Sequence, residues 1–147
     1  GRWGMFFGTH APRLDDKGRL VLPAKFRDAL SDGLVMTKGQ EHSIEVWSAA
    51  DFAAHAAKLN EASRTDARRR AHLRVLFSGA CDETLDKQGR VTIPPALRDY
   101  AGLDRDVVVI GQGQTFEIWD AGSWNDYLSS HEDAFSSVDE EVIPGIL

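Results

Sequence analysis

The sequence predicts an α+β protein in which two copies of one small unit interlock into a single small β-barrel flanked by helices. The first observation is a repeated pattern, LDDKGRLVLP at 14–23 and LDKQGRVTIP at 85–94, in which five of ten positions are identical. The second is that each copy leads to a similar strand, IEVW at 44–47 and FEIW at 116–119. Only two copies exist, which indicates a duplicated domain and not an open solenoid.

Size explains why the two units would share one core. Each unit has about 45 residues before its last helix, which is too few to bury an adequate core alone. The chain has 147 residues, of which 42% are hydrophobic and 27% charged. These values suit one globular domain, or two very small ones that interlock.

The first unit carries strand, turn and helix signals in a definite order. Leu20 and Leu22 lie on one face of a half-buried strand, and Pro23 suits the first turn of a helix. Ser48 and Asp51 resemble a capping box. We expect a strand, a tight turn, a strand, a short helix, a hairpin and a helix at 5–9, 15–18, 20–22, 24–30, 34–38 with 43–47, and 52–59.

The second unit repeats this order, and the short helices carry matched pairs, Arg27-Asp28 and Arg98-Asp99. Between the units, Asp66 can cap a helix that runs through Phe77. The second-unit signals fall at 86–89, 91–93, 96–101 and 107–110 with 115–119, followed by a short helix from about 121 to 128. The tryptophans expected to pack between hairpin and helix, and not to stack on bases, are Trp47, Trp119 and Trp124.

Composition divides the chain into four segments. We expect the first repeat with its trailing helix at 5–59, a basic linker helix at 60–80, the second repeat at 81–128 and an acidic, mobile tail at 129–147. The apolar end of that tail, residues 142–147, could dock on another surface. Met5 is a plausible start, so the four residues before it are expected to precede the natural chain.

Charge is distributed unevenly along the chain. The net charge of −6 at first argues against a nucleic-acid partner. However, residues 13–27 hold five Lys or Arg against two Asp, and residues 64–74 hold five Arg against one Asp. Residues 129–147 hold five carboxylates and no Lys or Arg. Charge alone therefore leaves a solvated surface and a nucleic-acid site equally open.

The sequence does not favour an enzyme or a metalloprotein. Asp15 and Asp16 are adjacent, so they point to opposite sides of a strand and do not form a catalytic pair. The five histidines show no ligand spacing with Cys81 or with carboxylates. No Walker or nucleophile-elbow motif surrounds Ser78 or residues 111–113. We expect no catalytic residue, metal, cofactor or small-molecule substrate.

Two features bear on the cellular compartment. The longest strongly apolar run, Val107–Ile110, is the size of a strand, so no membrane span is expected. The single cysteine, Cys81, cannot form an internal disulfide and suits a reducing cytoplasm.

The repeated turn carries the chemistry best suited to a function. Arg19 and Arg90 each follow a glycine, and an arginine fork matches guanine O6 and N7 or a phosphate. Asp15 and Asp86, four residues earlier, are placed to brace these arginines by bidentate pairs. Gly18 and Gly89 are expected to be exposed, which would let the backbone approach phosphates closely. The alternative is a well-formed turn that carries only a surface ion pair.

These turns, 71 residues apart with Gly before each Arg and Pro four residues after it, resemble the MraZ family of bacterial transcriptional regulators. The resemblance covers Met5 to about Leu128 and includes MFFG at 5–8. It implies two swapped-hairpin units of the SpoVT-AbrB type in one chain and a ring-shaped homo-oligomer. It also implies binding to short direct repeats in double-stranded DNA upstream of the division and cell-wall gene cluster, in the cytoplasm and at the nucleoid.

The resemblance further implies a set of DNA-contacting residues, which are Asp15, Lys17, Gly18, Arg19, Asp86, Lys87, Gly89 and Arg90. Gln88 stands where the first turn has Lys17, so equal contributions from the two turns are not expected.

Two other functions stay open. One is an AbrB-like antitoxin that binds DNA and a toxin, with the acidic tail wrapping a basic partner. The other is a structural interaction module that does not bind DNA.

Overall fold

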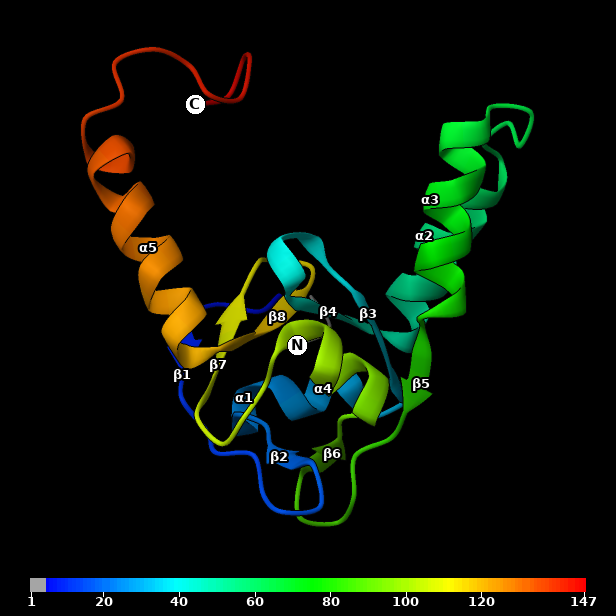
Figure 1. The fold of residues 1–147 in the computed structure, drawn as a ribbon, viewed down its shortest axis with the longest axis vertical. Coiled ribbons are helices and arrows are strands. Elements are labelled where there is room, and N and C mark those ends of the chain that lie inside the picture. The colour runs from blue at the N-terminus through cyan, green and yellow to red at the C-terminus, as the bar shows by residue number, and fades with distance from the viewer. Residues whose placement is uncertain (1–4) are drawn as a thin grey trace.

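The fold is built on two antiparallel sheets (Figure 1). The computed structural model describes residues 5–147, so the four residues expected to precede the natural start lie outside the described residues. The strands are β1 (Thr9–His10), β2 (Arg19–Val21), β3 (Leu34–Lys38), β4 (Ile44–Ser48), β5 (Cys81–Glu83), β6 (Arg90–Thr92), β7 (Val107–Gly111) and β8 (Phe116–Asp120). The helices are α1 (Ala24–Arg27), α2 (Ala49–Asn60), α3 (Ala67–Ser78), α4 (Pro95–Ala101) and α5 (Ala121–Ser136), with short 3₁₀ turns η1 (Asp28–Leu30) and η2 (Gln40–His42).

The two repeats are joined by strand pairing in both sheets. In the larger sheet the order is β1-β7-β8-β4-β3-β5, and the central pair β4–β8 joins the hairpin of one repeat to that of the other. The smaller sheet consists of β2 and β6, one strand from each repeat, with Leu20 opposite Val91. The predicted α+β class is confirmed, and the halves depend on each other for their backbone hydrogen bonds.

The prediction of a closed barrel is wrong for the described residues, because β1 and β5 are open edges of the larger sheet. These edge strands are only two and three residues long. Such short strands offer too few backbone groups for a ladder that would close the sheet on itself. The strand expected over residues 5–9 is likewise reduced to β1 and a single bridge between Phe6 and Gly113, because Gly8 interrupts it with a φ of +87°.

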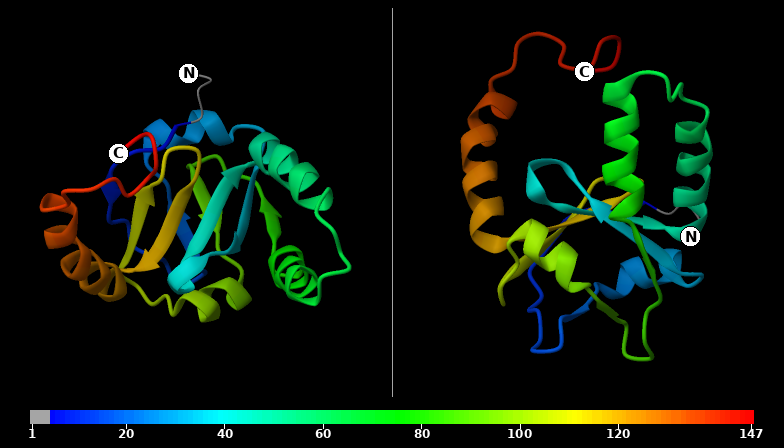
Figure 2. Two further views of the ribbon diagram at one scale, coloured as in Figure 1. Left: turned by 90° about the horizontal axis from the view of Figure 1, so that it is seen from above. Right: turned by 45° about the vertical axis from the view of Figure 1, so that its right-hand side comes forward.

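One core lies between the inner face of the larger sheet and the layer formed by β2, β6, α1 and α4 (Figure 2). Three phenylalanines form its centre: the Phe6 ring lies edge-on to Phe26 at 5.0 Å and to Phe116 at 5.1 Å. Leu20 and Val91 are buried at the same core from the smaller sheet. The alternation read in the repeated strands therefore holds, with one face buried and the other open.

The outer face of the larger sheet carries a tryptophan from each repeat. Trp47 stacks on His55 of α2 at 4.3 Å, and Trp119 meets Trp124 of α5 at 5.2 Å. The prediction that these tryptophans pack between hairpin and helix is confirmed.

Each indole N–H also donates to the glutamate two residues earlier, Glu45 or Glu117, at 2.8 Å. Those glutamates lie opposite each other in β4–β8, where burial raises the pKa of Glu117 and the Glu45 charge raises it further.

Two helical arms rise from opposite flanks of the sheet, α2 with α3 on one side and α5 on the other (Figures 1 and 2). The predicted helix starts are confirmed: Ser48 accepts from the Asp51 N–H, and Asp66 accepts from the N–H groups of Arg68 and Arg69. The expected end of the last helix near residue 128 is wrong, because α5 continues through Ser136. Residues 129–136 contain no Gly or Pro to stop it.

Replacing Gly111 with alanine should destabilise the fold. The added methyl group would collide with the backbone of Phe6 and Phe7, which crosses directly over this glycine. We expect the free energy of unfolding to fall by about 1–3 kcal/mol, the range for an overfilled interior, in urea denaturation. Gly122→Ala is the matched control, since the nearest neighbour of its methyl group is an Asp120 carboxylate oxygen at 3.4 Å. Equal stability of the two variants would contradict this packing.

Candidate nucleic-acid interface

The two repeated turns lie side by side at the end of the molecule remote from the arms, beyond β2 and β6 (Figure 1). In the first turn the Asp15 N–H donates to the Arg19 carbonyl at 2.9 Å, and the Gly18 N–H donates to the Asp15 carbonyl at 3.0 Å. Asp86, Gly89 and Arg90 make the same bonds at the same distances. Gly18 and Gly89 share a φ of +75°, the left-handed region that favours glycine. The predicted tight turns are confirmed as two copies of one conformation.

The aspartate of each turn organises the loop from within. Asp15 Oδ1 accepts from the N–H groups of Lys17 at 2.9 Å and Arg19 at 2.8 Å, and its Oδ2 accepts from Arg19 Nε at 2.7 Å. Asp86 does the same in the second turn, with Arg90 Nε 2.8 Å from its Oδ2. The predicted bracing of Arg by Asp is confirmed, but the bidentate form is wrong. One carboxylate oxygen is occupied by backbone N–H groups, so only the other reaches the guanidinium.

This bracing determines how the arginines face outward. The Arg19 and Arg90 side chains are 30% and 26% exposed. Within residues 5–147, their terminal guanidinium nitrogens have no hydrogen-bond acceptor. With Nε held by aspartate, the remaining donors form an end-on fork. Such a fork can meet two acceptors in one plane, as guanine or phosphate oxygens present them.

Hydrogen bonds also fix the charge state of the turns. The Arg19 N–H is the main cause that lowers the pKa of the Asp15 carboxyl, and the Arg19 side chain and the Lys17 N–H act in the same direction. The Arg90 N–H and side chain lower the pKa of Asp86 in the same way. Both carboxylates are therefore ionised at neutral pH, where they hold their arginines most firmly.

Each turn is locked by the opposite repeat. The Gly89 carbonyl accepts from the Leu22 N–H at 3.1 Å, and the Gly18 carbonyl accepts from the Ile93 N–H at 2.8 Å. The Arg27 guanidinium lies over Gly89 while it donates to the Leu22 carbonyl at 2.9 and 3.1 Å. Its counterpart from the second repeat lies over Gly18. The relative position of the turns is thus fixed by contacts that cross between repeats.

These contacts correct one expectation and add two residues. Gly18 and Gly89 are buried and not exposed, because arginines of the opposite repeat cover them. Sequence reasoning noted Arg27 and Arg98 only as members of matched Arg-Asp pairs and assigned them no role at the turns. Their equal distance from the repeated turns was the signal that could have identified them.

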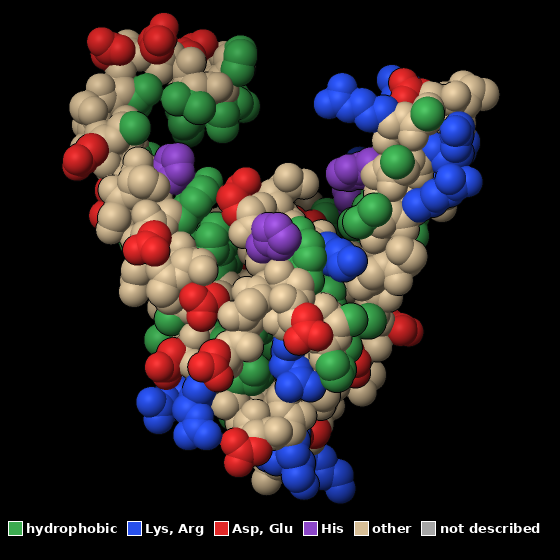
Figure 3. Space-filling view, viewed as in Figure 1, with side chains coloured by type: hydrophobic (Ala, Val, Ile, Leu, Met, Phe, Trp, Pro, Cys, Tyr) green, Lys and Arg blue, Asp and Glu red, His purple; other side chains and the backbone are tan. Residues whose placement is uncertain are grey.

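The exposed tips of the turns differ in charge pattern. Lys17 is exposed in the first turn, and Lys87 with Gln88 in the second, so each tip carries one lysine at a different position. Nearby, Arg105 pairs with Asp16 at 3.3 Å, and a further exposed pair joins Arg13 to Asp106. Figure 3 shows the Lys and Arg side chains gathered at this end of the molecule. All eight predicted contact residues therefore lie in two adjacent turns, and their contact with DNA stays a prediction.

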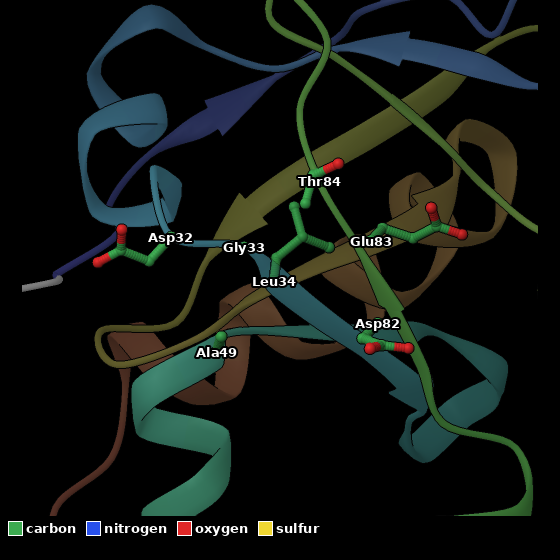
Figure 4. A pocket seen from close by; sticks show the side chains of 7 residues that line it. All are labelled: Asp32, Gly33, Leu34, Ala49, Asp82, Glu83 and Thr84. Atoms are coloured by element: carbon green, nitrogen blue, oxygen red, sulfur yellow. The ribbon is translucent and has the colours of Figure 1, made fainter.

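A hollow of about 270 Å³ lies between β5 and the start of α2 (Figure 4). Asp32, Asp82 and Glu83 line it, but Figure 4 shows the Asp32 and Glu83 carboxylates pointing apart. Across residues 5–147 no group of three or more His, Cys, Asp or Glu is placed to hold a metal ion. No helix in the same range is long and apolar enough to cross a membrane.

The fold and the paired turns define a class of duplicated α+β proteins that present two Asp–Arg turns together. The family model described as "MraZ protein, putative antitoxin-like" matches this chain twice, over residues 5–75 and 76–144. A protein of Leifsonia xyli subsp. xyli named "Transcriptional regulator MraZ" is 56% identical over 142 residues, 97% of this chain and 99% of that protein. A protein of the same name from Paenarthrobacter aurescens is 55% identical, over 97% of this chain and all of that protein. The chain belongs to the MraZ family.

Lowering the pH should release the turns through their aspartates. Because folding lowers both aspartate pKa values, the stabilisation is complete above the unfolded value near 3.9 and is lost as the pH falls through the folded value. Between pH 7 and about 5 the Arg19 and Arg90 amide NMR shifts should stay constant and then move together below about 4. Asp15→Asn should abolish the pH-dependent change of the Arg19 amide shift and leave that of the Arg90 amide shift in place. A carboxyl titrating above its ordinary value would contradict the bracing.

Arg27→Ala should loosen the turn of the other repeat. The substitution removes the donor to the Leu22 carbonyl and uncovers Gly89, so we expect faster amide exchange at residues 86–90 than at 15–19. The loss of a charged hydrogen bond of this kind costs about 1–3 kcal/mol. Lys25→Ala, on the exposed side of the same short helix, is the matched control. Faster exchange confined to residues 15–19 would show that the lock does not cross between repeats.

Proposed function

We propose that this protein is a sequence-specific DNA-binding transcriptional regulator whose two Asp–Arg turns enter the major groove together. The observation that carries the proposal is the pair of adjacent turns at one end of the molecule, which share one backbone conformation and each present an arginine fork. Relatives named as transcriptional regulators over nearly their whole length support the regulatory role. A turn projecting from a small sheet can enter the groove as β-ribbon readers do.

The proposed contacts divide by chemistry. Arg19 and Arg90 read guanine or grip phosphate through their terminal nitrogens. Asp15 and Asp86 hold those arginines in position and do not themselves meet the nucleic acid, which would repel them. The lysines at the tips, Lys17 and Lys87, neutralise phosphates. Gly18 and Gly89 serve by giving the turn its shape beneath the covering arginines.

We assign the two repeats to swapped-hairpin units of the AbrB type within this chain. The pairing of β2 with β6 and of β4 with β8, each from different repeats, supports this assignment. In this reading the units at 5–59 and 81–128 are joined by the basic helix region at 60–80 and followed by the acidic tail from 129. The duplication then places on one chain the two turns that a single unit would obtain only by dimerisation.

The same proposal includes a ring-shaped homo-oligomer that binds short direct repeats upstream of division and cell-wall genes, at the nucleoid. The two adjacent turns of one chain together cover only a few base pairs, so one chain gains little specificity. Several chains held in a rigid ring can engage successive repeats at once, and each linked contact gains from effective concentration. The antitoxin alternative uses the same turns, and it predicts a small basic protein that copurifies with the chain.

Arg19→Ala and Arg90→Ala test the proposal most simply. Each should weaken binding to a DNA duplex selected from a random library by the wild-type protein, by about 1–3 kcal/mol if the fork meets guanine. Binding is measured by fluorescence anisotropy over a range of salt concentrations, since phosphate contacts make affinity salt-dependent. Arg13→Ala, which removes an exposed arginine paired with Asp106, is the control. Folded Arg19→Ala and Arg90→Ala proteins with unchanged affinity would refute the contact.

A further inference from the structure

We propose that Arg105, which belongs to the second repeat, completes the DNA-contacting surface of the first turn by neutralising Asp16 at the tip of that turn. The inference rests on the proposed function and goes beyond it, because Arg105 lies outside both turns. Arg105 acts through Asp16 and does not itself contact the nucleic acid.

The tips of the two turns carry opposite charges at one equivalent position. Each tip begins with the residue after the bracing aspartate, which is Asp16 in the first turn and Lys87 in the second. The Asp16 side chain is 92% exposed, so it faces whatever approaches the tip. A phosphate backbone attracts a lysine in this place and repels a carboxylate. Left alone, Asp16 would therefore oppose the contact that Lys87 favours.

Arg105 is held at the entrance to the first turn and faces Asp16. Its carbonyl accepts from the Leu14 N–H at 2.9 Å, and a backbone bridge joins the neighbouring residues Arg13 and Asp106. The Arg105 guanidinium reaches the tip, where its Nη2 lies 3.3 Å from Asp16 Oδ1. Because the backbone is tied in this way, the second repeat places this guanidinium beside the first turn.

The matching place in the first repeat is occupied by Asp32. The Asp106 carbonyl accepts from the first N–H of α5 and the Gly33 carbonyl from the first N–H of α2, both at 3.1 Å. Asp106 and Gly33 are therefore equivalent, and so are the residues just before them, Arg105 and Asp32. The repeats thus differ in the sign of their charge at a second position.

The signs at these two positions are reversed together. Where the first tip is acidic, at Asp16, the opposite repeat supplies the base Arg105; where the second tip is basic, at Lys87, the equivalent place holds Asp32. Lys17 and Lys87 make no ion pair within the described residues, so both keep their charge for phosphates. Once Arg105 offsets Asp16, each turn presents an arginine fork and one lysine whose charge is unbalanced.

The stability of the free protein gives little reason for the Asp16–Arg105 pair. Both side chains are exposed, and ion pairs of this kind contribute little to folding. Bound DNA changes the balance, because it brings phosphates close and displaces water. Charge interactions strengthen as the effective dielectric constant falls. Neutralisation of Asp16 therefore matters more in the complex than in the free protein.

Removing Arg105 alone, and then together with Asp16, tests the inference on the full chain. Arg105→Ala should weaken binding to the duplex selected by the wild-type protein by about fivefold per chain engaged, the factor for two unit charges about 4 Å apart in water. In anisotropy over a range of salt concentrations, it should also reduce the salt slope of the affinity by about one unit per chain engaged. Arg105→Ala combined with Asp16→Ala should regain the wild-type affinity and slope. Arg105→Asp combined with Asp16→Lys should bind at least as tightly as the wild type, since it gives the first turn the charges of the second.

Arg13→Ala is the matched control. It also breaks an exposed ion pair and removes one positive charge, but the carboxylate that it leaves, Asp106, is not on a turn. It should keep the wild-type affinity, and all variants should keep the wild-type circular dichroism. Unchanged affinity in Arg105→Ala, an equal loss in Arg13→Ala, or double variants as weak as Arg105→Ala would overturn the inference.

Arg19→Ala, measured on the same duplex, separates this inference from the proposed function. If Arg19→Ala weakens binding and Arg105→Ala does not, only the role of Arg105 is refuted. If neither substitution weakens binding, the proposed DNA contact of the first turn is refuted as well.

Discussion

The antiparallel pairing of β2 with β6 is the constraint on which the rest of the molecule depends. Each strand comes from a different repeat, and each continues directly from an Asp–Arg turn. The pairing is reinforced by the two carbonyl groups of Gly18 and Gly89, which accept from strands of the opposite repeat. Because the turns are joined in this way, their relative position is set by contacts between the repeats. Duplication therefore converts two weak local motifs into one preorganised surface.

A division of labour follows from this arrangement. The end with the turns is tightly hydrogen-bonded and built around the ionised Asp15 and Asp86, which suits recognition of a fixed shape. The opposite end carries extended arms of opposite charge that have few contacts with their own body (Figure 3). The paired turns and the charged helical arms are thus separated in space, at opposite ends of the molecule. The single core lies between these two ends.

Local features of this fold could be predicted from sequence, and long-range ones could not. The turns, the caps at Ser48 and Asp66 and the packing of Trp47 and Trp119 all follow from residue types a few positions apart. The closed barrel was wrong, because closure depends on whether distant edge strands are long enough to meet. The predicted end of α5 was also wrong. A polar composition reduces the burial of a segment in the core, but it does not stop a helix.

At the candidate nucleic-acid interface, too, local features could be predicted from sequence and long-range ones could not. The aspartate bracing was predicted, but the burial of Gly18 and Gly89 was not, because the covering arginines approach from the opposite repeat. Arg98 covers Gly18 and Arg27 covers Gly89, and the members of each pair lie too far apart in the sequence for any local pattern to connect them. Equal spacing of Arg27 and Arg98 from the turns hinted at a shared role, and only the three-dimensional pairing revealed which glycine each one covers.

We propose that both turns contact DNA together while the arginine-rich helix α3 does not. Hydrogen–deuterium exchange of the full chain, with and without the duplex selected by the wild-type protein, distinguishes the two surfaces. DNA should slow exchange at residues 15–19 and 86–90 alike and leave α3 unchanged. Protection of α3 with unchanged turns would refute the proposal, since it would assign nucleic-acid binding to the other basic surface of the molecule.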